Sequence, residues 1–390
     1  MSVVQADVPA LTDRLLADIA DQLGRPVPAR YAAALRAVPR HLFLPDRLWL
    51  RDGTGGYRPC DRNTDPDDWW TAAYTDTPLV TQFSDHAPSS SASMPSMVLR
   101  TLLLADAPRT ARTKPGAVLE LGTGTGFNAA LLCALYGQDH VTTVELDPVL
   151  ADEAEANLKA AGHVPAVVTG DASVRLPDRA LFDLMVATFS TDHVPDLWRE
   201  RCRPGGQIVT PWFSDWCVYG TLALVTTAGH RAEGRFHPFG SYMPVRTSTS
   251  VPASNTPPED SSSPSRVRST TSLSPWAVAG GDLDAEFHLG LTVPRVSFAW
   301  DSTGEHAPIR LWLHGADGVS VASVDYDGHQ SEEFAVVQEG PRQLWDETTA
   351  AYARWERLGR PPVDRHGLTV CEDGVHQVWI DAPEALLTRY

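Results

Sequence analysis

Apolar residues recur at every fourth position near the start of the chain, at Leu11, Leu15, Ile19 and Leu23. This spacing places them on one face of a helix and predicts an amphipathic first helix. A second helix is predicted from Pro28 to about Val38. The stretch RDGTGGYRPCDRNTDPDD that follows is rich in Gly and Asp, so we expect residues 51–76 to form a polar insertion outside any core.

Between residues 117 and 212, short apolar runs alternate with longer helical patterns. Strands are predicted at AVLEL, VTTVEL, AVVT, FDLMVAT and QIVTPW, and helices at NAALLCALY and PVLADEAEANLKAA. Such alternation is typical of a doubly wound, mainly parallel sheet. The expected fold class is therefore α/β and Rossmann-like, preceded by N-terminal helices and followed by a smaller C-terminal α+β region.

The clearest break in the pattern is TSTSVPASNTPPEDSSSPSRVRSTTSLSP, residues 247–275, which has little to bury and predicts a mobile linker or long exposed loop. Beyond it, VSFAW, IRLWLHG, VSVASVDYD and EEFAVVQEG predict strands, LWDETTAAYARWERLG a helix, and LTVCEDGVHQVWID a hairpin that turns at Asp373 and Gly374. We expect the tryptophans of this region to anchor a core, with a peptide-binding surface as the alternative.

The net charge and the cysteine pattern limit which classes of partner and ligand are possible. With 49 acidic and 32 basic residues the net charge is −17, which argues against nucleic acid or an acidic membrane surface. The 5 cysteines show no spacing typical of a metal site, so we expect reduced thiols and no bound metal. The N-terminus lacks the features of a signal peptide, and no long apolar stretch occurs. The expected location is the cytoplasm.

A glycine-rich turn follows the first predicted strand of the sheet, in VLELGTGTGFN. Gly122, Gly124 and Gly126 would permit a tight turn and a close approach of backbone to ligand. Phe127 stands where a dinucleotide-binding fingerprint has its third glycine, and no GK[ST] follows, so neither a pyrophosphate loop nor a P-loop is favoured.

Acidic residues end the predicted strands, where ligands bind in open α/β sheets. Glu120 lies inside the end of the first strand, where it disfavours a phosphate and favours an ammonium group. Glu145 closes the next strand, where it would accept hydrogen bonds from a ribose, and Asp171, followed by Ala172, is placed for an adenine. S-adenosyl-L-methionine, with S-adenosyl-L-homocysteine as its product, fits these positions. A cofactor-free α/β domain and an oxidoreductase are the alternatives.

SSSASMPSMVLRTLL, residues 89–103, crowds serines around one proline before an apolar run. Pro95 suits the first turn of a helix and pushes Met94 toward an extended conformation, so a helix should begin here. The alternatives for Ser93 are a helix cap and a hydroxyl that binds substrate. We expect the preceding serines, Ser89 to Ser91, to be loop residues.

Taken together, RAVPRHLFLPD, the Ser-x-Pro segment, VLELGTGTGFNAALL, VTTVELD, TGDA and RPGGQIVTPW make residues from about Leu11 to Trp212 resemble protein-L-isoaspartate O-methyltransferases. The resemblance implies a class I S-adenosylmethionine-dependent methyltransferase fold. It places the three glycines at the methionine end of the cofactor, Glu145 at its ribose and Asp171 at its adenine. It also implies that Ser93 lies at the methyl-transfer centre and helps to hold a substrate carboxylate.

Further substrate contacts are expected at Ser91, Met94, Pro95, Thr188, Asp192 and His193. Arg40 and His41 are expected to be structural. A carboxylate with a pKa near 4 is ionised at neutral pH, so its methylation needs alignment rather than a general base. The expected organisation is a helical, substrate-contacting segment at 1–112, a cofactor-binding core at 113–246, the linker at 247–275 and a peptide-recognition region at 276–390.

Departures from the repair enzymes point to a branch of the family. Ser96 replaces a histidine, Ser91-Ala92 replaces Thr-Ile, and both the polar insertion and the C-terminal region are additions. These features resemble the methyltransferases of graspetide and lanthipeptide systems. That resemblance implies esterification of an aspartate in a macrocyclised ribosomal peptide, leading to succinimide (aspartimide) and isoaspartate. An isoaspartyl repair enzyme with an added domain and a non-catalytic peptide-binding scaffold are the alternatives.

Overall fold

The structure, a computed structural model, describes residues 7–84, 87–106, 116–177, 181–246, 266–301, 309–328 and 330–390. The chain divides into two compact units. The first comprises Met1–Phe189, Val194–Thr210 and Ala223–Ala232, and the second Ser190–His193, Pro211–Leu222 and Glu233–Tyr390. The boundary predicted at residues 112 and 113, and residues 247–265 of the predicted linker, lie outside the described residues.

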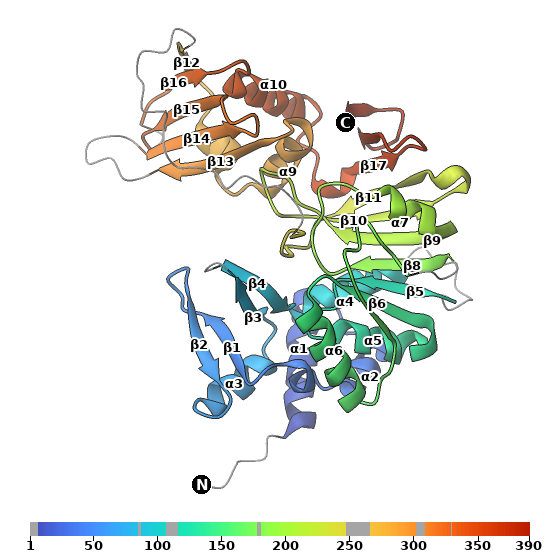
Figure 1. The fold of residues 1–390 in the computed structure, drawn as a ribbon. Helices are drawn as coiled ribbons and strands as arrows, with labels where there is room; N and C mark the ends of the chain where they lie inside the picture. Colours follow the sequence, from blue (N-terminus) through green and yellow to red (C-terminus); the bar gives the residue numbers. More distant parts are fainter. Residues whose placement is uncertain are drawn as a thin grey trace. The chain divides into compact units, whose positions relative to one another are not determined.

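Up to residue 230, the chain contains both helices and strands (Figure 1). The elements are α1 (Val8–Leu23), α2 (Ala29–Ala37), η1 (Arg40–Phe43), β1 (Arg47–Arg51), β2 (Tyr57–Asp61), α3 (Pro66–Ala73), β3 (Leu79–Ser84), β4 (Ala87–Ala92), α4 (Pro95–Asp106), β5 (Val118–Leu121), α5 (Phe127–Tyr136), η2 (Gln138–His140), β6 (Val141–Glu145), α6 (Pro148–Ala160), β7 (Ala166–Thr169), β8 (Phe182–Ala187), α7 (Asp196–Arg201), β9 (Cys202–Pro211), β10 (Thr221–Thr226) and η3 (Ala228–His230).

The predicted parallel sheet is confirmed in the first unit. Its strands lie in the order β9, β8, β5, β6 and β7, and β5 runs parallel to both β6 and β8. The three central strands β8, β5 and β6 are buried over almost their whole length, as expected for a parallel sheet covered on both faces. Because all these strands point the same way, their carboxyl ends share one edge of the sheet.

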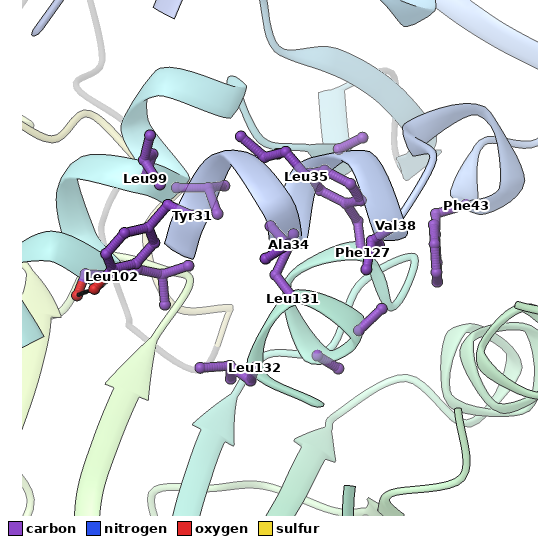
Figure 2. Packing of buried hydrophobic residues seen from close by; sticks show 14 of the residues in the cluster. Tyr31, Ala34, Leu35, Val38, Phe43, Leu99, Leu102, Phe127, Leu131 and Leu132 are labelled. Carbon is purple, nitrogen blue, oxygen red and sulfur yellow. Dashed lines mark hydrogen bonds between the residues drawn. The ribbon is translucent and has the colours of Figure 1, made fainter. Parts of the chain in front are cut away.

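The N-terminal helices extend the core of this sheet. The predicted first helix is confirmed as α1, which Asp7 caps and Gly24 ends with φ +65°. Figure 2 shows residues of α2 packed against Phe127 and Leu131 of α5, in one buried hydrophobic cluster. Burial of such a side chain contributes roughly 1.5–3 kcal/mol, so the N-terminal helices help to hold α5, which begins at the glycine loop, in place.

The prediction of a purely polar insertion at residues 51–76 is wrong. Both Cys60 and Trp69 are 0% exposed and belong to the same cluster as the N-terminal helices. In α3, Trp69, Ala72 and Ala73 share one buried face, and the Trp69 indole donates a hydrogen bond of 3.1 Å to the carbonyl of Pro45. The average composition concealed this apolar face, because charged residues surround it in the sequence.

The serine-rich stretch before Pro95 is also not the loop that we expected. Ser89, Ser90 and Ser91 lie in β4, which pairs antiparallel with β3 in a four-stranded sheet of order β2, β1, β3 and β4. The predicted helix start is confirmed, since α4 begins at Pro95. Ser93 therefore lies in the short connection between a strand and a helix.

From residue 232 onward the elements are β11 (Ala232–His237), β12 (Val267–Thr271), α8 (Pro275–Ala279), α9 (Leu283–Thr292), β13 (Val296–Asp301), β14 (Ile309–Gly315), β15 (Val321–Tyr326), β16 (Phe334–Glu339), α10 (Leu344–Arg357), η4 (Val363–Arg365), β17 (His366–Val370), β18 (His376–Ile380) and β19 (Leu386–Arg389). Strands β12, β16, β15, β14 and β13 form a five-stranded sheet in that order, and β19, β18, β17 and β11 are neighbours in that order.

Several predictions for the second unit are confirmed. The last hairpin joins β17 and β18, with Gly374 at φ +85° in its turn. Trp312, Trp345, Trp355 and Trp379 are buried, as core anchors should be, whereas Trp300 is only half-buried. The predicted linker ends earlier than expected, because residues 267–271 form β12 and pair with β16. No helix among the described residues combines the length and apolar character that a membrane crossing requires.

Candidate active site

Three glycines shape the loop between β5 and α5. Gly122, Gly124 and Gly126 have φ of +91°, +54° and +91°, a region that L side chains rarely adopt. A Cβ atom at Gly122 would lie 2.6 Å from the Thr188 hydroxyl oxygen, and one at Gly126 would lie 3.3 Å from the Ala154 carbonyl oxygen. Packing therefore excludes a side chain at Gly122, and at Gly126 a tight contact adds to the strain of the positive φ.

Gly124 differs from Gly122 and Gly126, because an added Cβ atom at Gly124 would meet almost no neighbouring atoms. Among the described residues, a Cβ atom added to Gly124 would meet within 4 Å only the carbonyl oxygen of Ser91, at 4.0 Å. The backbone of the loop thus borders open space on this side. The same contact shows that the end of β4, two residues before Ser93, lies beside the glycine loop.

Glu145 ends β6 and is 6% exposed. One of its carboxylate oxygens accepts a hydrogen bond of 2.8 Å from the Gly124 amide, and the other accepts one of 3.1 Å from the Asp147 amide. A carboxylate oxygen has two acceptor sites, so both oxygens retain capacity for further donors. Glu145 therefore holds the loop and can also receive a diol at the edge of the sheet.

The predicted ammonium partner, Glu120, lies deeper than the sequence suggested. It is 0% exposed, and its two oxygens accept hydrogen bonds from Asn128, at 2.7 Å, and from Thr143, at 2.5 Å. Burial raises the pKa of this carboxyl to about 8, although both hydrogen bonds oppose the rise. The hydroxyl of Thr143 also contacts that of Thr123 in the loop, at 2.5 Å. This geometry favours support of the glycine loop over direct contact with an ammonium group.

Asp171 and Ala172 follow β7, as predicted. The Asp171 Oδ1 atom accepts hydrogen bonds from the amide and hydroxyl of Ser173, at 2.8 Å and 2.6 Å, and so closes a local turn. Ala172 is buried, and its carbonyl accepts a hydrogen bond of 2.8 Å from the Trp198 indole. These contacts fix the backbone after the third strand at the edge where Glu145 ends the second.

The segment that carries Ser93 is tied to the rest of the first unit through Gln82, Asp147 and Asp76, which the sequence did not single out. The hydroxyl of Ser89 donates to Gln82 at 2.9 Å, and the Gln82 amide donates to Asp147, the capping residue of α6, at 3.0 Å. Asp76 accepts the Ser96 amide in the first turn of α4, at 2.8 Å. No local pattern could reveal these links, because their partners are distant in the sequence.

The contacts at the start of α4 disfavour a capping role for Ser93. Asp76, from another segment, accepts the first-turn amide that a capping serine would have taken. The carbonyl of Met94 accepts the amides of Met97 and Val98, and Pro95 is buried at the first helical position. Among the described residues, no hydrogen bond of the Ser93 hydroxyl is found, and Ser93 is half-buried. Its hydroxyl is not committed to the helix.

Thr188, Asp192 and His193, which were expected to contact substrate, make hydrogen bonds within the protein. The Thr188 hydroxyl donates to the carbonyls of Leu121, at 3.2 Å, and Gly122, so it ties the end of β8 to the glycine loop. Asp192 and His193 belong to the second unit, where the Asp192 carboxylate and the His193 ring lie 2.6 Å apart. Partial burial raises the pKa of Asp192, but the contact with His193 and further hydrogen bonding outweigh it, so the pKa lies below its usual value.

The residues of the first unit suit S-adenosyl-L-methionine. Open space beside the Gly124 backbone, a carboxylate at the end of β6 and an acidic turn after β7 lie along one edge of a parallel sheet, where such ligands bind. Gly124, Glu145 and Asp171 would hold this cofactor at its methionine end, its ribose and its adenine.

Comparison with known proteins identifies relatives of this chain. The family profile Protein-L-isoaspartate(D-aspartate) O-methyltransferase matches residues 60–215. The protein-L-isoaspartate O-methyltransferase of Methanococcoides burtonii is 33% identical over 198 residues, which cover 50% of this chain and 81% of that protein. The enzyme of the same name from Methanopyrus kandleri is 35% identical over 186 residues, covering 47% of this chain and 68% of that protein.

A solved structure of a protein-L-isoaspartate O-methyltransferase shares the fold. It is 17% identical, with a TM-score of 0.53, and the alignment covers 95% of this chain and 100% of that chain. The alignment therefore extends beyond the parallel sheet into the C-terminal region, which was expected to be an addition. From these relatives we conclude that the chain belongs to the protein-L-isoaspartate O-methyltransferase family, enzymes that methylate carboxylates with S-adenosyl-L-methionine as donor.

Proposed function

We propose that this protein methylates the free carboxylate of L-isoaspartyl residues in peptides and proteins, with S-adenosyl-L-methionine as donor and Ser93 at the transfer centre. One observation carries the proposal: the end of β4 approaches the open side of the glycine loop, with the Ser91 carbonyl 4.0 Å from the position of a Gly124 Cβ. The segment expected to hold substrate and the loop expected to hold cofactor therefore meet within one unit.

On the cofactor side, the binding residues stand at the carboxyl ends of the parallel strands. The backbone at Gly124 admits the methionine end, Glu145 accepts the ribose hydroxyls, and the turn at Asp171 and Ala172 receives the adenine. Glu120 acts through Thr143 and Thr123 to hold the loop. When bound, the cofactor supplies an electrophilic methyl group on a sulfonium.

On the substrate side, the uncommitted Ser93 hydroxyl donates a hydrogen bond to the carboxylate. The carboxylate is ionised at neutral pH, so it attacks without a general base, and its alignment with the sulfur–methyl bond supplies most of what the protein adds. A neutral hydroxyl suits this role, because a cation would stabilise the anion and reduce its nucleophilicity. Ser91, Met94 and Pro95 shape the backbone around it.

A second candidate substrate is an ordinary aspartate in a macrocyclised ribosomal peptide, as in graspetide and lanthipeptide pathways. Ser96 and the pair Ser91-Ala92 favour it, because they alter the substrate-side segment relative to the repair enzymes. Methylation there would make methoxide a leaving group, and closure by the following backbone nitrogen would give a succinimide that opens to isoaspartate. In this proposal, residues 276–390 recognise the shape of the peptide.

Peptide methylation assays separate the two candidates. The purified chain is incubated with methyl-labelled S-adenosyl-L-methionine and one of three peptides: an isoaspartyl peptide, its aspartyl isomer, or a macrocyclised aspartyl peptide. Base-labile label on the isoaspartyl peptide alone supports the first candidate. Label on the cyclised peptide alone favours the second. Label on neither, with no heat of cofactor binding by calorimetry, would revive a non-catalytic scaffold.

Ser93→Ala tests the assignment of the transfer centre. We expect methylation to fall by about 100-fold or more, while affinity for S-adenosyl-L-homocysteine stays within a few fold, because alignment is lost and the cofactor edge is not. Ser90→Ala, in the strand β4 that precedes Ser93, is the control that should retain activity, because Ser90 is only 6% exposed. A fully active Ser93→Ala enzyme would remove Ser93 from the centre.

A further inference from the structure

Arg40 is a buried cation at an unexpected place. It lies in η1, is 1% exposed, and its terminal guanidinium nitrogens donate to five backbone carbonyls. Three of these belong to residues 73–77, at 2.9 to 3.3 Å. The other two are the carbonyls of Ala92, at 3.3 Å, and Ser93, at 3.1 Å. The side chain thus joins two separate stretches of chain.

A second link joins the same two stretches on the other side of Ser93. Asp76 lies within residues 73–77, and its Oδ1 atom accepts the Ser96 amide at 2.8 Å. The turn from β4 into α4 is therefore held at Ala92 and Ser93 by Arg40, and at Ser96 by Asp76. Between these points stand only Met94 and Pro95, and the ring of Pro95 fixes its own φ.

We propose that Arg40, together with Asp76, is a positioning residue for methyl transfer: it fixes the backbone of Ser93 so that the hydroxyl meets the substrate carboxylate in line with the donor. This inference rests on the proposed function. Arg40 itself is too buried to touch substrate. Its planar fork can serve two carbonyl-lined segments at once, which the single ammonium of a lysine cannot do.

The guanidinium of Arg40 keeps its charge although it is buried. Burial lowers the pKa of its guanidinium to about 10, and Asp76 opposes that change, so the group remains charged at neutral pH. A buried charge needs hydrogen-bond partners, and five backbone carbonyls provide them for the two terminal nitrogens of Arg40, while its Nε has none among the described residues. In the sequence, RAVPRHLFLPD shows only a basic residue inside an apolar run.

The test compares Arg40→Lys with Arg199→Lys. Arg199 is 2% exposed in the same unit and donates to the carbonyl of His230, so it is a matched buried arginine outside the site. Both variants should lose stability. Only Arg40→Lys should lower kcat, by about 10- to 100-fold, with affinity for S-adenosyl-L-homocysteine within threefold, because a misplacement near 1 Å has that effect on transfer.

A double-mutant cycle with Ser93→Ala shows whether Arg40 acts through Ser93. In the Ser93→Ala background, Arg40→Lys should lower kcat by less than about threefold. An equal loss in both backgrounds, or a folded Arg40→Lys enzyme with wild-type kcat, would overturn the inference. If Arg40→Lys does not fold, Asp76→Ala takes its place, since that side chain is only half-buried, and it should show the same non-additive loss.

The outcomes distinguish this inference from the proposed function. If the wild-type chain methylates none of the three peptides, or if Ser93→Ala is fully active, the proposed function fails whatever Arg40 does. If the wild type is active and Ser93→Ala is not, but neither Arg40→Lys nor Asp76→Ala changes kcat, only the positioning role fails.

Discussion

Gly124→Ala offers a test of the cofactor site in which ligand binding and folding can be separated. Gly124 has φ +54°, so an alanine there is strained by roughly 1–2 kcal/mol, partly offset by the reduced freedom of the unfolded chain. No clash adds to this, since the new methyl group meets only the Ser91 carbonyl at 4.0 Å. We therefore expect the free energy of unfolding to fall by about 1 kcal/mol.

The effect on ligand should be larger than the effect on folding. If the methionine end of the cofactor fills the space beside Gly124, the added methyl group overpacks that contact by about 1–3 kcal/mol. Since about 1.4 kcal/mol is a tenfold change in affinity, binding should weaken by roughly 5- to 150-fold. Titration calorimetry with S-adenosyl-L-homocysteine measures this without turnover, and denaturant unfolding measures the stability.

Gly162→Ala is the matched control. Gly162 follows α6 with φ +83°, and a Cβ there meets nothing within 4 Å, so this variant carries the backbone strain without the site. It should lose a similar free energy of unfolding and bind the ligand normally. If Gly124→Ala binds within twofold of wild type, or if both variants lose affinity equally, the placement of the cofactor at the glycine loop is refuted.

The remaining predictions concern the sheet edge and the second unit. Glu145→Gln should weaken S-adenosyl-L-homocysteine binding about tenfold or more, because charge-assisted hydrogen bonds contribute about 1.5–3 kcal/mol each. Titration calorimetry measures this affinity, and Asp152→Asn, on the exposed side of α6, is the control variant. Equal affinities of the two variants would contradict the prediction. Thr188→Val should lower the free energy of unfolding by about 1 kcal/mol through its lost hydrogen bonds to the glycine loop, and an unshifted denaturation midpoint would argue against this. The Nδ1 atom of buried His288 lies 2.9 Å from the Nε2 atom of buried His366, and burial lowers their pKa from 6.5 to about 3 and about 4. Their stabilisation is complete above pH 6.5 and is lost as the pH falls toward 4, so at pH 5 about 2 kcal/mol per histidine should be missing; a denaturation midpoint that stays constant from pH 8 to pH 5 would disprove it.

Much of the first unit was predictable because its signals are local. The strands and helices from residue 117 to 212 follow from their own hydrophobic patterns, and the strand-to-helix turn at Gly122, Gly124 and Gly126 from glycine itself. The carboxyl-end positions of Glu145 and Asp171 followed once the strands were assigned, since parallel strands share their ends. These features depend on residues that are close in the sequence.

The predictions that were wrong concern segments whose structure depends on distant partners. Residues 51–76 read as polar by composition, yet Trp69 and Cys60 join the core through a face that only the fold of α3 creates. Ser89 to Ser91 became a strand because β3 supplies the hydrogen bonds of a ladder. Such pairing overrides a weak local preference.

The sequence by itself determined the parallel sheet, the glycine turn and the acidic strand ends, because periodicity and backbone freedom act over a few residues. Only the tertiary structure decided that Ser91 borders Gly124, that Asp76 rather than Ser93 accepts the first-turn amide of α4, and that Arg40 holds the Ser93 carbonyl. These contacts join residues up to 53 positions apart, and a buried arginine can find five carbonyls only after the chain has folded around it.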